Sequence, residues 1–257
     1  MKKKYKRMKY SIGITTYEHR FEKYLKPLIS KIKEMRPEIE ILVSVNGENN
    51  KQFNEEYRTE VLSFLSGMKN TFVTTYPTYR GLGKLWNNLL ANSSNHLVLL
   101  LNDDVTITGD TFFKELELLL SRGVSFFKIN QSWSHAMVDR RVVDDIGWFD
   151  ERYLSIGEED GDFEWRYGQR FNTPLCNTLV SHIVNHVDHD NCLLGMEKVN
   201  GKYSKFNLDF AFGTKYRVDP KGKNYGIMNR SVICDSPTPP QHTAERFYWE
   251  HKEELKI

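Results

Sequence analysis

Residues 97–105 read LVLLLNDDV, so an apolar run is followed at once by three polar residues. The run predicts a buried strand that ends at Asn102, Asp103 and Asp104. Adjacent carboxylates repel each other, and a cation between them removes that repulsion; hard oxygen ligands suit Mg²⁺ or Mn²⁺. The stretch therefore indicates a divalent-cation site at the end of a strand, with an Asp that caps the following turn as the alternative.

The chain around this stretch alternates between strand-like and helix-like segments. Strands are predicted at residues 10–16, 39–45, 71–76, 96–101 and 124–129, and helices at residues 21–35, 52–65 and 83–91 and after the turn residues 108–110. Such alternation with short connections predicts an α/β fold, in which a mostly parallel, Rossmann-like sheet has helices on both faces.

Ligands of sheets of this kind bind at the carboxyl ends of the strands. The residues at and just past the ends of the first four predicted strands are mostly polar: Thr15, Thr16, Tyr17, Asn46, Gly47, Tyr79, Arg80, Gly81, Asn102, Asp103 and Asp104. We therefore expect the binding site at this edge.

We predict four regions along the chain. Residues 1–9 form a basic tail, residues 10–130 a nucleotide-binding half, residues 131–194 an acceptor-side and catalytic half, and residues 195–257 a C-terminal extension with an amphipathic helix at 244–255. A lid, a linker and a partner surface are the alternatives for residues 195–240, where no periodicity is visible.

The composition is that of an ordinary globular protein, with 39% hydrophobic and 27% charged residues among 257. No apolar run approaches the roughly 20 residues of a membrane helix, and no signal-peptide pattern follows the basic start. The three cysteines are an odd number without a Cys-x-x-Cys pair, which favours free thiols in a reducing compartment. We therefore expect a cytoplasmic protein.

Charge is unevenly distributed along the chain. The first ten residues hold six of the 36 Lys and Arg residues and no acid, so the remainder carries 30 basic against 34 acidic residues. A mildly acidic body is not typical of a nucleic-acid-binding surface, which draws on clustered Lys and Arg. The basic tail is interpreted as a solvated end, with weak contact to anionic lipid headgroups as the alternative.

Five acids stand within seven residues at 158–164, interrupted by Gly161. A solvated loop before a helix start is the simple interpretation, since acids favour the positive end of a helix dipole. The neighbouring aromatic residues favour a second interpretation, because they offer a stacking surface for sugars or bases and a carboxylate there can act as a general base. These aromatic residues are Trp148, Phe149, Phe163 and Trp165.

Three of the eight histidines, His182, His186 and His189, lie within eight residues. The spacing of His182 and His186 puts both on one face of a helix, or on one face of an extended segment. A single histidine is more often structural, so we expect one of the three to contact a metal.

Taken together, these motifs resemble those of the GT-A glycosyltransferases, specifically the inverting family 2 type that uses nucleotide-sugar donors. Over about residues 10–189, the resemblance lies in four segments that occur in the family's order: residues 12–20, residues 80–87, Asn102-Asp103-Asp104 in place of the Asp-x-Asp motif, and residues 146–151 followed by 159–166.

The resemblance implies a metal-dependent, inverting transfer of a hexosyl or deoxyhexosyl group from a nucleotide-diphosphate sugar to a hydroxyl acceptor such as a glycan. It implies Asp160 as the catalytic base and Mn²⁺ or Mg²⁺ on Asp104 and His186. It also implies two sets of binding residues: for the donor Thr15, Thr16, Tyr17, Asn46, Lys84 and Asp103, and for the acceptor Trp148, Glu159 and Asp162. The acids near residue 103 and those near residue 160 are then expected to meet in one cleft.

Two other functions are open on the sequence. A nucleotidyltransferase that makes nucleotide sugars would share the Rossmann-like half, but it needs a glycine-rich basic loop after the first strand, where this chain has TTYEHR at 15–20. A non-catalytic carbohydrate-binding relative would not need the acidic cluster around Asp160. Three departures from the family pattern, Asn46, Tyr79 and Asn102, leave the nucleotide base undetermined.

Overall fold

The computed structural model describes residues 9–17, 20–47, 54–77, 80–154, 156–186 and 206–215. The chain divides into two compact units, each described by itself below. Unit 1 comprises Met1–Tyr79, Asn88–Val143 and Leu175–Asp188, and unit 2 comprises Arg80–Asn87, Asp144–Pro174 and His189–Ile257.

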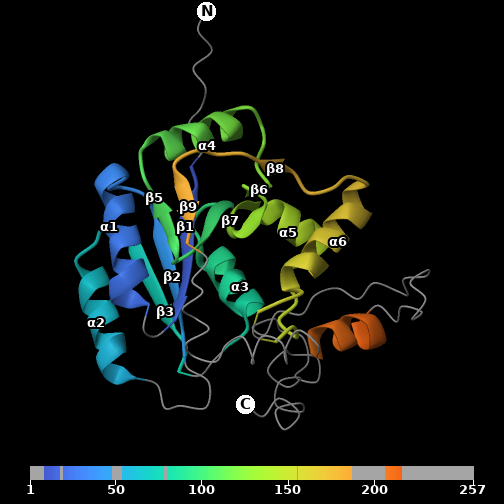
Figure 1. The fold of residues 1–257 in the computed structure, drawn as a ribbon, viewed down its shortest axis with the longest axis horizontal. Coiled ribbons are helices and arrows are strands. Elements are labelled where there is room, and N and C mark those ends of the chain that lie inside the picture. Colours follow the sequence, from blue (N-terminus) through green and yellow to red (C-terminus); the bar gives the residue numbers. More distant parts are fainter. Residues whose placement is uncertain are drawn as a thin grey trace, which may run out of the picture. The chain divides into compact units, whose positions relative to one another are not determined.

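Helices and strands follow one another along the chain as Figure 1 shows. Their bounds are β1 Ser11–Tyr17, a π-helix Phe21–Leu25, α1 Lys26–Met35, β2 Ile41–Asn46, α2 Glu55–Ser66, β3 Thr71–Thr75, α3 Leu82–Asn92, β4 Leu97–Asn102, β5 Val105–Ile107, α4 Thr111–Ser121, β6 Phe127–Ile129, β7 Ser132–Asp139, α5 Arg140–Ile146, α6 Glu159–Phe171, β8 Asn177–Thr178, β9 Ile183–Asn185 and a second π-helix Phe210–Lys215.

Unit 1 is built on a seven-stranded sheet of order β3-β2-β1-β4-β7-β6-β8. Strands β1 to β4 pair in parallel, and β7 pairs antiparallel with both β4 and β6. The chain runs outward from β1 through β2 to β3 and then returns to place β4 on the other side of β1. The predicted α/β fold with a mostly parallel sheet is confirmed, and the strand order reverses between β1 and β4.

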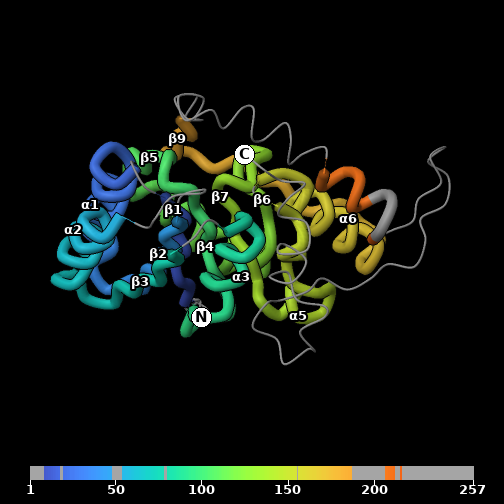
Figure 2. Tube along the Cα trace, turned by 90° about the horizontal axis from the view of Figure 1, so that it is seen from below, coloured from blue at the N-terminus to red at the C-terminus, as the bar shows by residue number. Residues whose placement is uncertain are grey.

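A large apolar core lies between one face of this sheet and the helices α1, α2 and α4. Alternate residues of the strands, such as Ile12, Val43 and Leu99, pack there against helix residues such as Ile29 and Phe113, all fully or almost fully buried. Helices α1 and α2 lie side by side in both ribbon and tube views (Figures 1 and 2). Burial of this apolar surface is the main stabilising contribution to unit 1.

The opposite face of the sheet is approached closely by the last turns of α3. A Cβ atom added to Gly13 of β1 would lie 3.1 Å from Leu89 Cβ and 3.2 Å from Leu100 Cδ2. Glycine at position 13 therefore lets α3 pack directly on β1.

Unit 2 has its own buried groups around α6. The rings of Phe149 and Phe163 stack with centroids 4.5 Å apart. Tyr153 and Phe210 meet edge to face at 5.3 Å, so the second π-helix packs against the loop before α6. Asn207, just before the second π-helix, also bonds to Leu154 in the loop before α6. Its side-chain amide donates to the Leu154 carbonyl at 2.9 Å and accepts from the Leu154 N–H at 2.8 Å.

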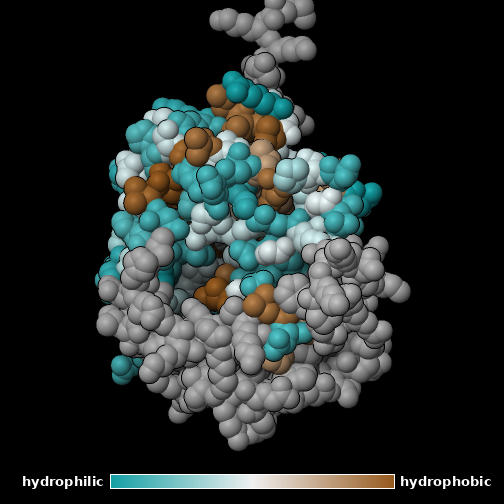
Figure 3. Space-filling view, turned by 45° about the vertical axis from the view of Figure 1, so that its right-hand side comes forward, coloured by the Kyte–Doolittle hydropathy of each residue, from teal (hydrophilic) through white to brown (hydrophobic). Residues whose placement is uncertain are grey.

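The described surface is predominantly hydrophilic on the face shown in Figure 3, where hydrophobic groups are separated by polar ones. Phe72 and Leu179 are among the exposed large hydrophobic residues, at 56% and 81% exposure. No helix within the described ranges has the length and apolar character needed to cross a membrane.

Several sequence-based expectations differ from the structure. Strands β5 and β7 were not expected, and β9 lies on the segment for which a helix and an extended arrangement were both open. Strand β6 begins at Phe127 rather than Val124, because residues 124–126 belong to the connection after α4. The helix expected at 244–255, Tyr79 and His189 lie outside the described residues. The four predicted regions stay a prediction.

Candidate active site

The ends of β1 and β4 bring the first group of predicted residues together. Thr15 is paired with Asn102 in the parallel register, and its hydroxyl lies 3.3 Å from Asn102 Oδ1. The Thr16 hydroxyl donates to Asp103 Oδ2 at 2.5 Å. Because β1 and β4 are the strands at which the sheet order reverses, these side chains lie at the topological switch point, where ligands of open α/β sheets bind.

Tyr17 and Asn46 complete the same edge on the β2 side. They are paired across β1 and β2, and Asn46 is 5% exposed. The Tyr17 carbonyl accepts a hydrogen bond from the Tyr57 hydroxyl at 3.1 Å, which ties this edge to α2. The structure thus gathers Thr15, Thr16, Tyr17, Asn46 and Asp103 in unit 1; their donor-binding role stays a prediction.

Arg20, which was not among the predicted residues, forms ion pairs with the carboxylates of both Asp103 and Asp104. Its Nη2 atom lies 2.7 Å from Asp103 Oδ1 and 3.0 Å from Asp104 Oδ2. Its Nη1 donates to the Tyr17 hydroxyl at 3.0 Å, and its Cζ lies 4.9 Å from the ring centroids of both Tyr17 and Tyr24. A buried guanidinium therefore neutralises part of the charge of the acidic pair.

Burial governs the electrostatics of this group. It raises the pKa of Asp103 to about 6, against the opposing effects of the Arg20 guanidinium and the Thr16 hydroxyl. Burial alone would lower the pKa of Arg20, but the Asp103 carboxylate, with Tyr17 and Asp104, raises that pKa well above its ordinary value. Arg20 is thus permanently charged.

His135 on β7 is a second residue that sequence reasoning missed. It is 3% exposed, is paired in register with Leu101 at the end of β4, and has a buried Nδ1 without a hydrogen-bond partner among the described residues. Burial lowers its pKa to about 4, although the Asp104 carboxylate acts in the opposite direction. His135 is therefore a neutral imidazole near the acidic pair at pH 7.

The histidines of residues 182–186 lie on an extended segment, which decides between the two expected arrangements. The His186 N–H donates to the Asp104 carbonyl at 2.9 Å, and His186 Nε2 lies 2.7 Å from the Thr106 hydroxyl. His182 has a φ of 62° and lies 3.3 Å from the Thr108 hydroxyl through Nδ1. The backbone thus places His186 next to Asp104, while its metal-binding role stays a prediction.

The fit of a divalent cation depends on the donor set around Asp104. Within the described ranges, no group of three or more His, Cys, Asp and Glu side chains is arranged to hold a metal ion. Asp103 and Asp104 nevertheless supply adjacent carboxylate oxygens, which Mg²⁺ and Mn²⁺ prefer. The donors fit such a cation, and it would have to share them with Arg20.

In unit 2, Asp162 is part of a buried network rather than of an open surface. It accepts from Arg166 Nε at 2.9 Å and from the Tyr153 hydroxyl at 3.1 Å, and it lies 2.7 Å from Lys215 Nζ. Lys215 also lies 2.7 Å from Asp150. These contacts join α6 to the second π-helix and give Asp162 a structural part.

The same network determines the charge of Asp150. Burial acts to raise the pKa of Asp150, but the Lys215 ammonium and the Arg152 guanidinium outweigh it and hold that pKa well below the usual range. The Arg152 Nη2 atom lies 2.7 Å from Asp150 Oδ2.

Asp160 and Glu159 lie next to each other at the start of α6 in different environments. Asp160 is half-buried and accepts the Gly161 N–H at 2.8 Å, whereas Glu159 is 3% exposed and accepts the Gly157 N–H at 2.6 Å. Burial, followed by the charge of Asp160, raises the pKa of Glu159 to about 8. At neutral pH Glu159 is therefore mainly protonated, and Asp160 is the more accessible carboxyl group.

The last two predicted residues of unit 2 also have identified partners. Lys84 on α3 is 8% exposed, and its Nζ lies 3.5 Å from Glu151 Oε2. Trp148 is half-buried, and its Nε1 donates to Asp144 at 3.0 Å. The donor role of Lys84 and the acceptor roles of Trp148, Glu159 and Asp162 stay predictions.

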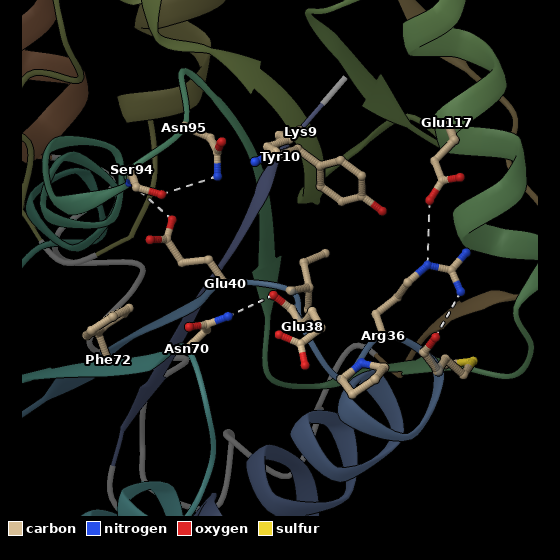
Figure 4. A pocket seen from close by; sticks show the side chains of 13 residues that line it. Lys9, Tyr10, Arg36, Glu38, Glu40, Asn70, Phe72, Ser94, Asn95 and Glu117 are labelled. Atoms are coloured by element: carbon tan, nitrogen blue, oxygen red, sulfur yellow. Dashed lines mark hydrogen bonds and ion pairs between the residues drawn. The ribbon is translucent and has the colours of Figure 1, made fainter. Parts of the chain in front are cut away.

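A cavity of about 700 Å³ lies at the other edge of unit 1, beside the amino ends of the parallel strands (Figure 4). Its polar lining groups bond to one another: Asn70 Nδ2 donates to the Glu38 carbonyl at 3.0 Å, and the Ser94 N–H donates to Glu40 at 3.1 Å. Because ligands of such sheets bind at the carboxyl ends, we assign the candidate site to the Asp103 edge instead.

No family model matches the chain, and no curated protein sequence is similar to it. Solved structures do match. S. aureus TarS 1–349 has a TM-score of 0.52 at 16% identity, covering 82% of this chain and 73% of that chain. Glucosyl-3-phosphoglycerate synthase from Mycobacterium tuberculosis, in complex with Mn²⁺, UDP and glucosyl-3-phosphoglycerate, has a TM-score of 0.53 at 13% identity, covering 79% of each chain.

S. aureus TarS 1–349 in complex with UDP-GlcNAc matches with a TM-score of 0.50 at 15% identity, over 80% of this chain and 73% of that chain. At identities this low, the structural similarity is evidence for the fold alone. The chain therefore has the GT-A glycosyltransferase fold that the sequence motifs led us to expect.

Proposed function

We propose that this protein is an inverting glycosyltransferase of the family 2 type that moves a sugar from a nucleotide-diphosphate donor to a hydroxyl acceptor, with a glycan as acceptor. The observation that carries the proposal is the group at the β1/β4 switch point, where Thr16 and Arg20 hold Asp103 and Arg20 also pairs with Asp104. Two of the solved structures with this fold contain UDP-GlcNAc, or UDP with Mn²⁺, which supports a nucleotide-sugar donor.

In the proposed reaction, Asp160 takes the proton of the acceptor hydroxyl. The acceptor oxygen attacks the C1 atom of the sugar, and the bond between C1 and the diphosphate oxygen breaks with its electron pair leaving on the diphosphate. Attack opposite the leaving group inverts the configuration at C1. Asp160 suits the role of base because it is half-buried and accessible, whereas Glu159 is mainly protonated and Asp162 is held in ion pairs.

A divalent cation would be held by Asp104, with His186 as a further ligand, and would stabilise the charge of the diphosphate when bound. Asp103, Thr15, Thr16, Tyr17 and Asn46 would contact the nucleotide. The expected cytoplasmic location belongs to this proposal as well, whereas weak lipid contact of the basic tail remains the alternative to a solvated end; residues 1–8 lie outside the described residues.

The test is sugar transfer from a panel of nucleotide sugars, beginning with UDP sugars, to glycan acceptors. Asp160→Asn is expected to lower kcat by about 10²- to 10⁴-fold, the usual contribution of a general base. Asp104→Ala is expected to lower kcat/KM and to abolish stimulation by Mn²⁺. Undiminished turnover in either variant would remove that residue from its role. Transfer of a nucleotidyl group instead of a sugar would replace the proposal by its main alternative.

A further inference from the structure

Arg20 contacts Asp104, which would hold the proposed cation, together with the neighbouring Asp103. One nitrogen of its guanidinium, Nη2, contacts a carboxylate oxygen of Asp103 at 2.7 Å and one of Asp104 at 3.0 Å. We propose that Arg20 is an internal counter-ion that competes with the divalent cation for Asp104 and turns toward the donor diphosphate when the cation binds. This inference rests on the proposed function, which places a cation on Asp104.

The surroundings of Arg20 are suited to hold it in place. The main chain at Arg20 is bonded into the turn after β1: its N–H donates to the Tyr17 carbonyl at 3.3 Å, and its carbonyl accepts from Tyr24 and Leu25 at 3.0 and 3.1 Å. The rings of Tyr17 and Tyr24, each 4.9 Å from Cζ, offer uncharged faces on which a guanidinium is stabilised. A fixed main chain with a stacked side chain lets the guanidinium exchange partners without unfolding the turn.

The charges of Asp103, Asp104 and Arg20 explain why Arg20 weakens binding of the cation. Two ionised carboxylates and one guanidinium leave a single negative charge, which attracts a divalent cation less strongly than the bare pair would. A divalent cation neutralises both carboxylates alone, so the Arg20 charge becomes free to meet the diphosphate. By linkage, anything that draws Arg20 away from Asp104 raises the affinity for the cation.

The experiment measures Mn²⁺ binding to the full chain without nucleotide, by isothermal titration calorimetry. Arg20→Met removes the charge but keeps an apolar stem between the tyrosines, and it is expected to bind Mn²⁺ at least about tenfold more tightly than wild type. Arg20→Lys keeps the charge and is expected to stay within about threefold of wild type. Lys23→Met is the matched control: Lys23 is exposed and contacts the same Tyr24 ring at 4.8 Å, so its loss is expected to leave the Mn²⁺ affinity unchanged.

Equal Mn²⁺ affinities of wild type and Arg20→Met would overturn the counter-ion role while leaving sugar transfer by the wild-type protein intact. An equal gain in Lys23→Met would also overturn it, because any nearby positive charge would then have the same effect. The double variant Arg20→Met, Asp104→Asn should lose the gained affinity; if it does not, the ion lies elsewhere and the competition is refuted. Failure of the proposed function is distinguishable, since it shows as absence of sugar transfer by wild type.

Circular dichroism establishes that each variant is folded before titration. Should Arg20→Met fail to fold, Arg20→Gln replaces it, because Gln is also uncharged and retains a donor for the Tyr17 hydroxyl. Its Mn²⁺ affinity is expected to rise in the same way, and an unchanged affinity would count equally against the proposal.

Discussion

At the residue scale, burial has its clearest effect on stability at Glu159. Its pKa rises from 4.5 to about 8, mainly because the carboxyl group is buried. The folded protein therefore binds a proton that the unfolded chain releases near pH 4.5. The contribution of Glu159 to stability is fully present below that pH, and it is lost as the pH rises through about 8.

Glu159→Gln should remove this loss. We expect the variant to match the wild-type protein near pH 4 and to exceed its free energy of unfolding by roughly 4 kcal/mol at pH 8. Urea denaturation across this pH range measures the difference. Glu164→Gln, on the same helix but half-buried, is the control for removing a carboxylate from α6. A difference between wild type and Glu159→Gln that does not grow with pH would contradict the buried, protonated state.

Gly13 offers a test of the packing of α3 on β1. A Cβ at position 13 would lie 3.1 Å from Leu89 Cβ, which is closer than ordinary contact, so Gly13→Ala should destabilise the protein by about 1–3 kcal/mol. The midpoint of urea unfolding measures this. Gly67→Ala is the control, because nothing lies within 4 Å of a Cβ there and its φ is −81°. Equal midpoints for the two variants would refute the close approach.

The site residues on strand ends were predictable, and Arg20 and His135 were not. Asp103 and Asp104 stand out in the sequence because an apolar run stops at them. Arg20 has no such signal, since an arginine three residues beyond a strand end is usually solvated, and only the approach of the β4 end, with Asp103 and Asp104, explains its burial. His135 lies on a strand that reads SWSHAMVD, whose polar residues resemble a loop.

At the element scale, the buried ammonium group of Lys215 ties the second π-helix to Asp150 and to Asp162 of α6 within unit 2. Lys215→Met would leave Asp150 and Asp162 with less positive charge in a buried place, and we expect a loss of about 3–5 kcal/mol in the free energy of unfolding. Arg170→Met is the matched control, since the Arg170–Asp145 pair is exposed and should contribute less than about 1 kcal/mol. Thermal and urea unfolding measure both. A loss as small as that of the control would show that the network is not stabilising.

The first half of the fold was predictable at this scale because helix and strand periods alternate cleanly there. The first four strands begin and end within two residues of the predicted bounds. Strand β7 was missed because its central place depends on antiparallel pairing with β4, which lies well before it in the sequence, as well as with the adjacent β6. Strands β5 and β9 are three residues each, too short for a periodic signal.

At the scale of the whole molecule, donor binding should stabilise the folded state. With a nucleotide sugar and Mn²⁺ at about 100 times the dissociation constant, we expect about 2.7 kcal/mol of added stability and a higher Tm. Thermal denaturation with and without the donor measures it. Asp103→Asn should reduce the shift, and Glu38→Gln, in the cavity at the opposite edge of the sheet, should leave it unchanged. Loss of the shift in Glu38→Gln would move the donor site to that cavity.

The meeting of the acids near residue 103 with those near residue 160 stays a prediction. Periodicity reveals which residues follow a strand or begin a helix, but it carries no information on how two units approach each other. The fold class was predictable from the sequence, whereas the arrangement of two units depends on contacts that no local pattern encodes.

The last two strands of unit 1, β8 and β9, lie at residues 177–185, far along the sequence from β6 and β5, with which they pair. A ribosome making this protein would therefore expose β6 and β5 as open edges while the intervening residues are still being added. Such edges invite pairing between nascent chains, so we expect synthesis to be most vulnerable to aggregation in this interval and most responsive there to chaperones.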